Sequence, residues 1–140
     1  MFKPTTKFLI VDDFASMRKI IKNVLIQLGF HNLIEAVDGH NAYELLTKHS
    51  KTTEPFDFII ADWNMPNMSG LELLIKCRNE EPFKKIPFMM VTAENEQSQI
   101  IKACNVGVTE YVIKPFSPAK LKEKLESSFK KSNSSLKVAA

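Results

Sequence analysis

The sequence has little of what marks a secreted, membrane or nucleic-acid-binding protein. Only two of its 140 residues are cysteines, Cys77 and Cys104, which lie far apart in segments of helical character, so we expect reduced thiols rather than a disulfide. No apolar run approaches the roughly 20 residues of a membrane-spanning helix, and residues 1–6 do not resemble a secretory signal. The formal net charge is only +3, which does not indicate nucleic-acid binding. We therefore expect a cytoplasmic protein that binds neither membranes nor nucleic acids.

The length of the chain fits one domain that is large enough to bury a core without disulfides. We expect this domain to occupy residues 1–130. Residues 131–140 are rich in serine and other small or polar residues, which predicts a C-terminal tail without regular structure.

Short apolar runs alternate with segments of helical character along the domain. The runs have strand length and few polar residues, which is typical of strands buried on both faces of a parallel sheet. They cover residues 8–11, 32–36, 56–61, 86–91 and 110–113. Apolar spacing and helix-start and helix-stop signals predict helices over approximately residues 14–28, 39–47, 69–79, 96–105 and 118–129. Strict alternation of five strands and five helices predicts an α/β fold, with helices on both faces of a parallel sheet.

Polar and charged residues stand where four of the predicted strands end. Asp12 and Asp13 follow the first strand, Asp62 the third, Thr92 the fourth and Lys114 the fifth. Because the carboxyl ends of parallel strands share one edge of the sheet, we expect these side chains to converge there. Such an edge is where open α/β sheets bind ligands.

The converging groups suit phosphoryl transfer to an aspartate. Three crowded carboxylates repel one another, and a bound Mg²⁺, which prefers oxygen ligands, relieves this repulsion. A carboxylate can form an acyl phosphate, and Asp62 stands at the centre of the predicted edge. We therefore predict that Asp62 is the phosphoacceptor, that Lys114 and Thr92 assist the transfer, and that the backbone carbonyl of Asn64 reaches the metal bound by the three aspartates.

Each of these residues also has a simpler interpretation. An acidic pair after a strand often only caps the next helix, so Asp12 and Asp13 taken alone are equally well explained as capping residues. A lone threonine after a strand is commonly a turn residue, and a lone Lys-Pro a surface turn. The joint pattern at successive strand ends favours the phosphoacceptor site.

Four segments match the motifs of a known family. They are Asp12-Asp13-Phe14, Asp62-Trp63-Asn64-Met65-Pro66-Asn67-Met68, Val91-Thr92-Ala93-Glu94 and Tyr111-Val112-Ile113-Lys114-Pro115-Phe116. Over residues 7–129 the chain resembles the receiver domains of two-component response regulators, and among them the single-domain regulators of chemotaxis. The resemblance implies a flavodoxin-like (CheY-like) fold with strand order 2-1-3-4-5.

The resemblance also implies roles for the residues of the predicted edge. A histidine kinase would donate the phosphoryl group to Asp62, and Mg²⁺ would be held by Asp13, Asp62 and the Asn64 carbonyl, with Asp12 acting partly through water. The peptide bond between Lys114 and Pro115 would be cis. Asn64 would also tune the lifetime of the phosphoryl group, together with Glu94.

A switch surface on the fourth helix, fifth strand and fifth helix is a further implication. Phosphorylation would move Thr92 and bury Tyr111, and this surface, with Ile100 and Lys124, would bind the flagellar motor switch. Tyr111 taken alone is better explained as an ordinary strand aromatic. Gln97 departs from the family pattern, because a basic residue is expected on this surface.

We therefore predict a phosphorylation-activated response regulator, not an enzyme beyond its own phosphorylation and dephosphorylation chemistry. It would be a monomer that works with a histidine kinase and a motor-switch protein, and a phosphatase is a further candidate partner. One alternative is a receiver that acts as a phosphate shuttle or sink in another pathway. The other is a Mg²⁺-dependent phosphatase with an aspartyl-phosphate intermediate.

Overall fold

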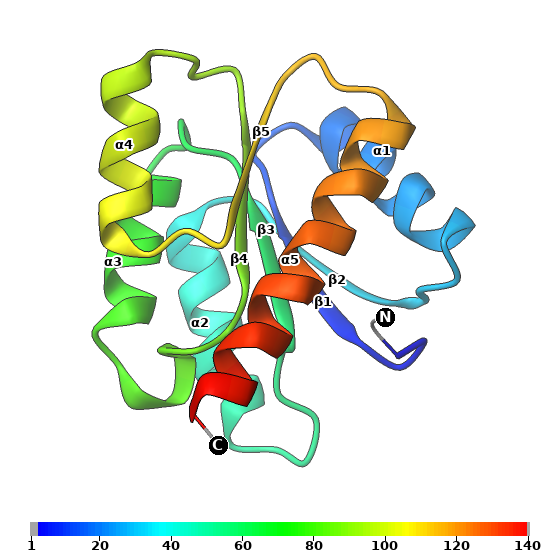
Figure 1. Ribbon diagram of the computed structural model, residues 1–140, viewed down its shortest axis with the longest axis vertical. Helices are drawn as coiled ribbons and strands as arrows, with labels where there is room; N and C mark the ends of the chain where they lie inside the picture. Colours follow the sequence, from blue (N-terminus) through cyan, green and yellow to red (C-terminus); the bar gives the residue numbers. More distant parts are fainter. Residues whose placement is uncertain (1–2, 140) are drawn as a thin grey trace.

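The computed structural model describes the backbone of residues 3–139 and the side chains of residues 3–131. Within these residues, five strands form one parallel sheet in the order β2-β1-β3-β4-β5, as the resemblance implied (Figure 1). The strands are β1 (Lys7–Val11), β2 (Asn32–Ala36), β3 (Phe58–Ala61), β4 (Phe88–Thr92) and β5 (Glu110–Ile113). The helices are α1 (Ala15–Gln27), α2 (Gly39–Ser50), α3 (Gly70–Arg78), α4 (Gln97–Val106) and α5 (Pro118–Ala139), with a short 3₁₀ helix η1 (Glu81–Phe83) after α3.

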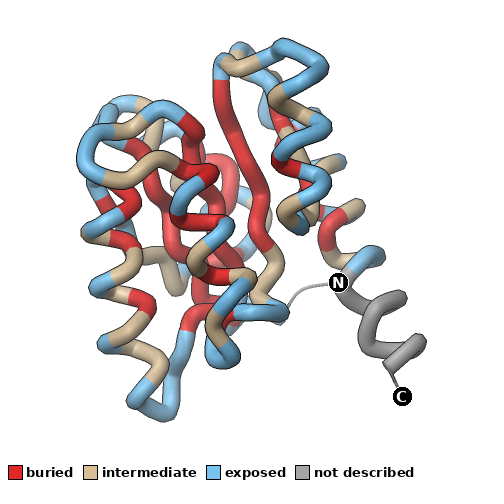
Figure 2. The backbone as a smooth tube through the Cα atoms, turned by 90° about the vertical axis from the view of Figure 1, so that its left-hand side faces the viewer, coloured by how far each residue is buried: buried red, intermediate tan, exposed pale blue. Residues whose placement is uncertain are grey.

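The alternating side chains of the central strands divide the core into two layers. On one face of the sheet, Phe8, Ile10 and their neighbours pack against α1 and α5. On the other face, Leu9, Val11 and their neighbours pack against α2, α3 and α4. Figure 1 shows the two groups of helices on opposite sides of the sheet, and in Figure 2 the strands form the buried interior. Because both faces are covered, the central strands are apolar except for Lys7 at the start of β1 and Thr92 at the end of β4, which explains the continuous runs in the sequence.

The helix-start signals are confirmed. Asp38 caps α2 by accepting the backbone N–H of Asn41, and Ser69 forms a capping box with Glu72 at the start of α3. Before α5, the Ser117 hydroxyl accepts the N–H of Lys120 at 3.1 Å. By contrast, Phe14 occupies the cap position of α1 without a side-chain bond, so neither Asp12 nor Asp13 is the N-cap residue.

Several predicted boundaries differ from the structure. Helix α2 extends to Ser50, into the segment predicted as a polar loop, and β3 and β4 each begin two residues later than predicted. Phe56 is buried although it lies outside β3, so its apolar character reflects the core rather than strand pairing.

The C-terminal tail predicted over residues 131–140 stays a prediction. Helix α5 has the bounds Pro118–Ala139, but the side chains of residues 132–140 and the backbone of residue 140 lie outside the described residues.

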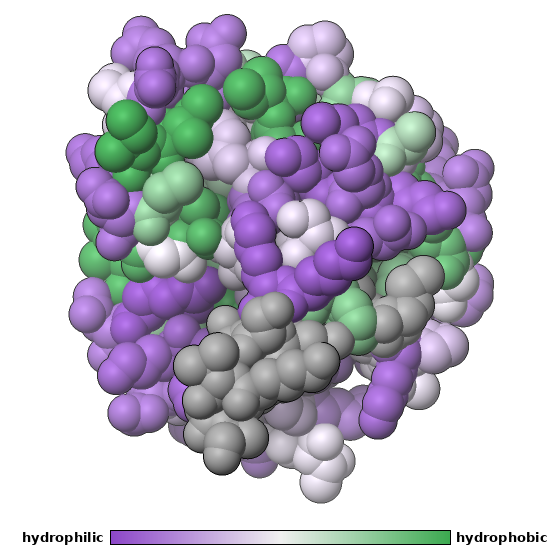
Figure 3. All heavy atoms as spheres, in the orientation of Figure 1, coloured by the Kyte–Doolittle hydropathy of each residue, from purple (hydrophilic) through white to green (hydrophobic). Residues whose placement is uncertain are grey.

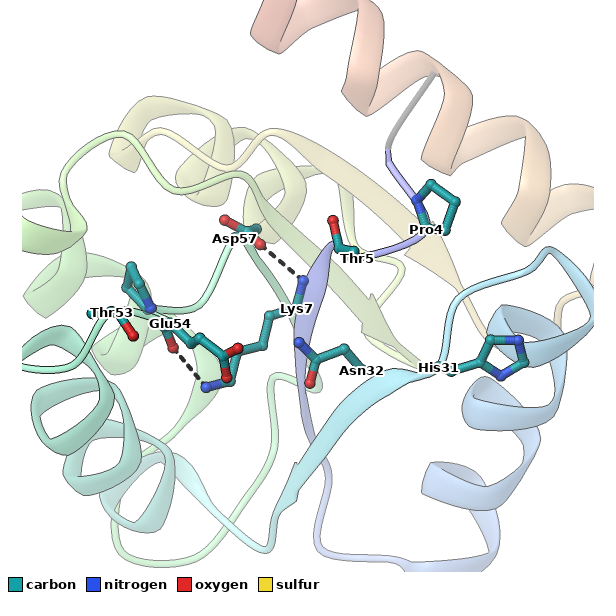
Figure 4. Close-up of a pocket in the computed structure, with 9 residues that line it drawn as sticks. Pro4, Thr5, Lys7, His31, Asn32, Thr53, Glu54 and Asp57 are labelled. Atoms are coloured by element: carbon teal, nitrogen blue, oxygen red, sulfur yellow. Dashed lines mark hydrogen bonds between the residues drawn. The ribbon is translucent and has the colours of Figure 1, made fainter.

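At the edge of the sheet where the strands begin, a lysine is held inside the protein. The side chain of Lys7 is buried, and its Nζ lies 2.5 Å from His49 Nδ1 and donates to the backbone carbonyl of Glu54 at 2.6 Å. A hollow of about 560 Å³ lies at this edge, with Lys7, Glu54, Asp57 and His31 among its lining residues (Figure 4). It opens at the end of the sheet opposite the predicted site. Since an ammonium only donates, His49 Nδ1 must accept, and the imidazole is therefore neutral.

This contact predicts a specific effect of pH on stability. Burial, followed by the charge of Lys7, lowers the pKa of His49 below 6.5. A lowered pKa in the folded state means that the unfolded chain binds more protons, so the free energy of unfolding falls as the pH drops below about 6.5. His49→Gln keeps an acceptor for Lys7 without a titrating ring. We expect the variant to lose less stability than the wild type between pH 7.5 and 5.5 in urea titrations.

A matched variant is His40→Gln, because His40 is exposed and its ring lies 3.3 Å from the exposed carboxylate of Glu44 rather than beside a buried lysine. This substitution should leave the pH dependence of the wild type nearly unchanged. Equal pH dependence of His49→Gln and the wild type would contradict the proposed linkage.

Candidate functional site

The three aspartates predicted at the carboxyl edge of the sheet lie together. Parallel pairing places Val11 of β1 beside Ala61 of β3, so the residues that follow, Asp12 and Asp62, are neighbours. One carboxylate oxygen from each of Asp12, Asp13 and Asp62 lies within 4.8 Å of the other two. Asp12 and Asp62 are buried, whereas Asp13 is exposed, so the cluster opens to solvent on one side.

Lys114 is the positive charge of this cluster. Its Nζ donates to Asp62 Oδ2 at 2.9 Å and to Asp12 Oδ2 at 3.0 Å. The backbone N–H of Lys114 donates to the carbonyl of Thr92 at 2.8 Å, which fixes the loop after β5 against β4. The bond from Lys114 to Pro115 is cis, as predicted.

Burial and charge act in opposite directions on these groups. Burial raises the pKa of Asp12, although the Phe14 N–H and Lys114 act to lower it. For Lys114, burial acts to lower the pKa, but the bonds to Asp62 and Asp12 outweigh it and the net pKa is raised. Lys114 is therefore an ammonium at neutral pH, and it offsets part of the charge of the acidic cluster.

Glu94 connects the predicted residues on the side of β4. Thr92 is fully buried at the end of that strand, and its hydroxyl oxygen accepts the N–H of Glu94 at 3.3 Å. The Glu94 carboxylate accepts the amide of Asn64 at 2.8 Å, and its backbone carbonyl accepts the hydroxyl of Tyr111 at 2.8 Å. Burial, followed by the charges of Glu94 and Asp62, raises the pKa of Tyr111 to about 12, so the phenol remains a donor. Glu94 therefore links the loop after β3 to Tyr111 on β5.

The other two predicted switch residues lie away from the acidic cluster. Ile100 is half-buried on α4, and Lys124 on α5 forms an ion pair with Glu110 at 3.3 Å. Glu110 is buried and also accepts from Ser127 at 2.7 Å and Lys131 at 2.9 Å. Sequence reasoning missed this role of Glu110. An acid at the first position of an apolar strand, with lysines on the following helix, is the signal that could have indicated it.

Arg18 is a second residue that the sequence did not reveal. Its guanidinium donates to the backbone carbonyl of Asp12 at 2.6 Å and to Glu35 Oε1 at 2.9 Å. Burial acts to raise the pKa of Glu35, but Arg18 and then Lys22 lower it, so the carboxylate stays charged. These contacts join the first turn of α1 to β2 and to the segment that carries Asp12.

The arrangement fits a divalent cation of the Mg²⁺ type. The donor set consists of carboxylate oxygens, which hard cations prefer, and it contains no imidazole or thiolate. Three carboxylates exceed the single ammonium of Lys114 in charge, so the cluster attracts a further cation.

Fold and site together define a class of signalling domain, and comparison with known proteins agrees. Residues 8–126 match the family model of the response regulator receiver domain, so the chain belongs to this family. Receiver domains of this kind are signalling switches rather than enzymes of the usual type.

Within this family, several proteins of chemotaxis are similar to the chain. The chain is 51% identical to the chemotaxis protein CheY of Pseudomonas aeruginosa over 127 residues, which cover 91% of this chain and 98% of that protein. It is 49% identical to the chemotaxis protein CheY-3 of Vibrio cholerae, over 89% of this chain and 92% of that protein. Among solved structures, the chemotaxis response regulator CheY4 of Vibrio cholerae matches with a TM-score of 0.76 and 34% identity, over 89% of this chain and 98% of that one.

A helix that spans a bilayer needs about 20 consecutive, mostly apolar residues. In the described part of the chain, none of them combines the length and the apolar character needed to span a membrane.

Proposed function

We propose that this protein is a phosphorylation-activated response regulator of chemotaxis, in which Asp62 within the domain of residues 1–130 accepts a phosphoryl group from a histidine kinase. The observation that carries the proposal is the cluster of Asp12, Asp13 and Asp62 within 4.8 Å, bridged by Lys114. The similarity to chemotaxis proteins at about half identity over nearly the whole chain supports the pathway.

The transfer is a simple displacement. A carboxylate oxygen of Asp62 forms a bond to phosphorus as the bond between phosphorus and the kinase imidazole nitrogen breaks, and the electron pair of that bond stays on the imidazole. Lys114, already bonded to Asp62, neutralises charge on the transferred group. Asp12, Asp13, Asp62 and the carbonyl of Asn64 would hold Mg²⁺, which supplies further charge neutralisation when bound.

The residues around Glu94 provide a route from the site to the surface. The hydroxyl of Thr92 would donate to a phosphoryl oxygen, which would change its contact with the Glu94 N–H. Glu94 also accepts hydrogen bonds from the Tyr111 hydroxyl and the Asn64 amide. A movement of Glu94 would therefore alter both the position of Tyr111 and the access of water to the phosphoryl group. We therefore assign Asn64 and Glu94 to control of the phosphoryl lifetime and Tyr111 to the switch.

The proposed output surface is formed by α4, β5 and α5, with Ile100, Tyr111 and Lys124 on it. Figure 3 shows hydrophobic side chains gathered over α4 and a hydrophilic surface over α5. Ile101 on α4 is 51% exposed, which adds apolar area to this surface. A mixed apolar and basic surface suits a partner peptide that presents apolar and acidic side chains, and we propose the flagellar motor switch as that partner.

Binding of a motor-switch peptide tests the proposal. We expect the wild type, phosphorylated by acetyl phosphate with Mg²⁺, to bind a fluorescently labelled peptide about tenfold more tightly than the unphosphorylated protein, a typical coupling between two sites. Lys114→Ala should still be labelled to a measurable extent, but its affinity for the peptide should not increase, because the group that couples Asp62 to the β5 loop is lost. Fluorescence anisotropy of the peptide measures the affinities of the wild type and of the variant.

Two outcomes would contradict the proposal. Equal affinity of both forms of the wild type would remove the motor switch as the partner, and return of the phosphoryl group to a histidine protein would then favour a phosphate shuttle. Repeated hydrolysis of an external phosphate ester by the protein would instead support a phosphatase.

A further inference from the structure

The loop between Asp62 and α3 is held from the side by the loop that precedes α2. Asp38 is 7% exposed, and its two carboxylate oxygens have different partners. Oδ1 accepts the N–H of Asn41 at 2.8 Å, whereas Oδ2 accepts the side-chain amide of Asn67 at 2.7 Å. The first bond caps α2, but the second reaches across to the segment that begins with Asp62. Helix capping therefore accounts for only one of the two oxygens.

A backbone contact lies beside this bond. The N–H of Gly39 donates to the carbonyl of Met68 at 3.1 Å, and a Cβ on Gly39 would lie only 2.4 Å from that oxygen. The two loops therefore touch through their main chains, at a distance that a side chain at position 39 would prevent. Asn67 itself has a φ of 67°, a left-handed conformation that an asparagine tolerates better than most residues.

The held segment is the one that carries the proposed metal ligands. It begins at Asp62, contains Asn64, and closes where the N–H of Gly70 donates to the carbonyl of Trp63 at 2.8 Å. Asn64 is exposed, and its amide bond to Glu94 restrains the segment from the β4 side. Asp38 restrains it from the opposite side, so the segment is fixed between two carboxylates that are not themselves in the acidic cluster.

We propose that Asp38, through its bond to Asn67, is a positioning residue for the cation site, one that holds the loop of Asp62 and Asn64 in its ligating arrangement. The inference rests on the proposed Mg²⁺ site. It adds to that site a supporting residue from the loop between β2 and α2. The carboxylate is ionised, since the Asn41 N–H, and more weakly Asn67, lower the pKa of Asp38 despite its burial. Groups that orient metal ligands typically change affinity by about 10- to 100-fold when they are removed.

The test measures Mg²⁺ affinity without any transfer of phosphate. Trp63 is the single tryptophan of the chain and follows Asp62 directly, and its backbone N–H donates to Asp62 Oδ1 at 2.6 Å, so the fluorescence of its indole should report binding. Asn67→Gly removes the amide, suits the positive φ and leaves the cap of α2 intact. We expect its dissociation constant for Mg²⁺ to be about tenfold higher than that of the wild type, and Asp38→Ala to show a similar rise.

A double variant and a control distinguish the positioning role of the Asp38–Asn67 bond from a general loss of order in the two loops. If the bond is responsible, Asp38→Ala combined with Asn67→Gly should bind Mg²⁺ no more weakly than either single variant. Asn41→Ala is the control, because Asn41 Oδ1 accepts the N–H of Val37 at 3.0 Å within the same turn without touching Asn67. Its Mg²⁺ affinity should stay within about twofold of the wild type, and circular dichroism should show that all variants are folded.

The results also distinguish this inference from the proposed function. A wild type that shows no Mg²⁺ binding by fluorescence or calorimetry would overturn both. Normal binding by the wild type, with unchanged affinity in Asn67→Gly and Asp38→Ala, would overturn the positioning role alone. Additive losses in the double variant, or an equal loss in Asn41→Ala, would also overturn it.

Discussion

Asp62→Asn is expected to abolish labelling of the protein by acetyl phosphate. The amide is isosteric with the carboxylate, but it is neutral and lacks a nucleophilic oxygen that can form an acyl phosphate. It also removes the charge that Lys114 contacts at 2.9 Å, so the ammonium would retain only Asp12. Intact-mass spectrometry after incubation with acetyl phosphate and Mg²⁺ measures the labelled fraction, which should fall to background.

Asp57→Asn provides a matched control for this experiment. Asp57 directly precedes β3 and is exposed, at the end of the sheet opposite Asp62. Its carboxylate accepts the backbone N–H of Lys7 at 2.9 Å. The same chemical change at this position should leave labelling at the level of the wild type. Normal labelling of Asp62→Asn would show that another residue is the acceptor.

Among Gly→Ala substitutions at the four glycines of the chain, Gly70→Ala is expected to cause the largest loss of stability. A Cβ on Gly70 would lie 1.9 Å from the carbonyl oxygen of Asp62 and 2.8 Å from its carbonyl carbon. Both atoms belong to the backbone that leaves β3, so relief requires a movement of the main chain rather than of a flexible side chain. Overpacking of this kind costs up to about 3 kcal/mol in the free energy of unfolding, which urea titration measures.

Gly29→Ala separates this clash from backbone strain. Gly29 has a φ of 96°, but a Cβ there would meet nothing within 4 Å. We expect a loss of roughly 1 to 2 kcal/mol from the left-handed conformation alone. If the loss for Gly70→Ala did not exceed that for Gly29→Ala, the close approach of Gly70 to Asp62 would not be the cause. Because the affected carbonyl belongs to Asp62, Gly70→Ala should also weaken Mg²⁺ binding.

The sequence was sufficient to predict the alternating elements and the edge where the acids meet. Strands buried on both faces leave continuous apolar runs, and parallel pairing brings their ends together, so the neighbourhood of Asp12, Asp62 and Lys114 follows from chain order alone. Boundaries were less certain, because an apolar residue such as Phe56 can serve the core without pairing in the sheet.

Contacts between side chains from distant segments were not predictable in this way. The partners of Asp38, Arg18 and Glu110 depend on how helices and loops are oriented over the sheet, which no local pattern specifies. The burial of Lys7 against His49 is another contact of this kind. Such pairs arise from tertiary packing, whereas the chemistry at strand ends arises from topology.

The bond from Lys114 to Asp12 joins positions that are 102 residues apart. During synthesis the ribosome would therefore release all three acids well before their ammonium partner. A nascent chain that ended before β5 would carry an unbalanced cluster of negative charge at an unfinished sheet edge. The charge of the cluster is therefore balanced, and the cluster is joined to the loop after β5, only after the last strand has docked, so incomplete chains would not signal through the proposed output surface.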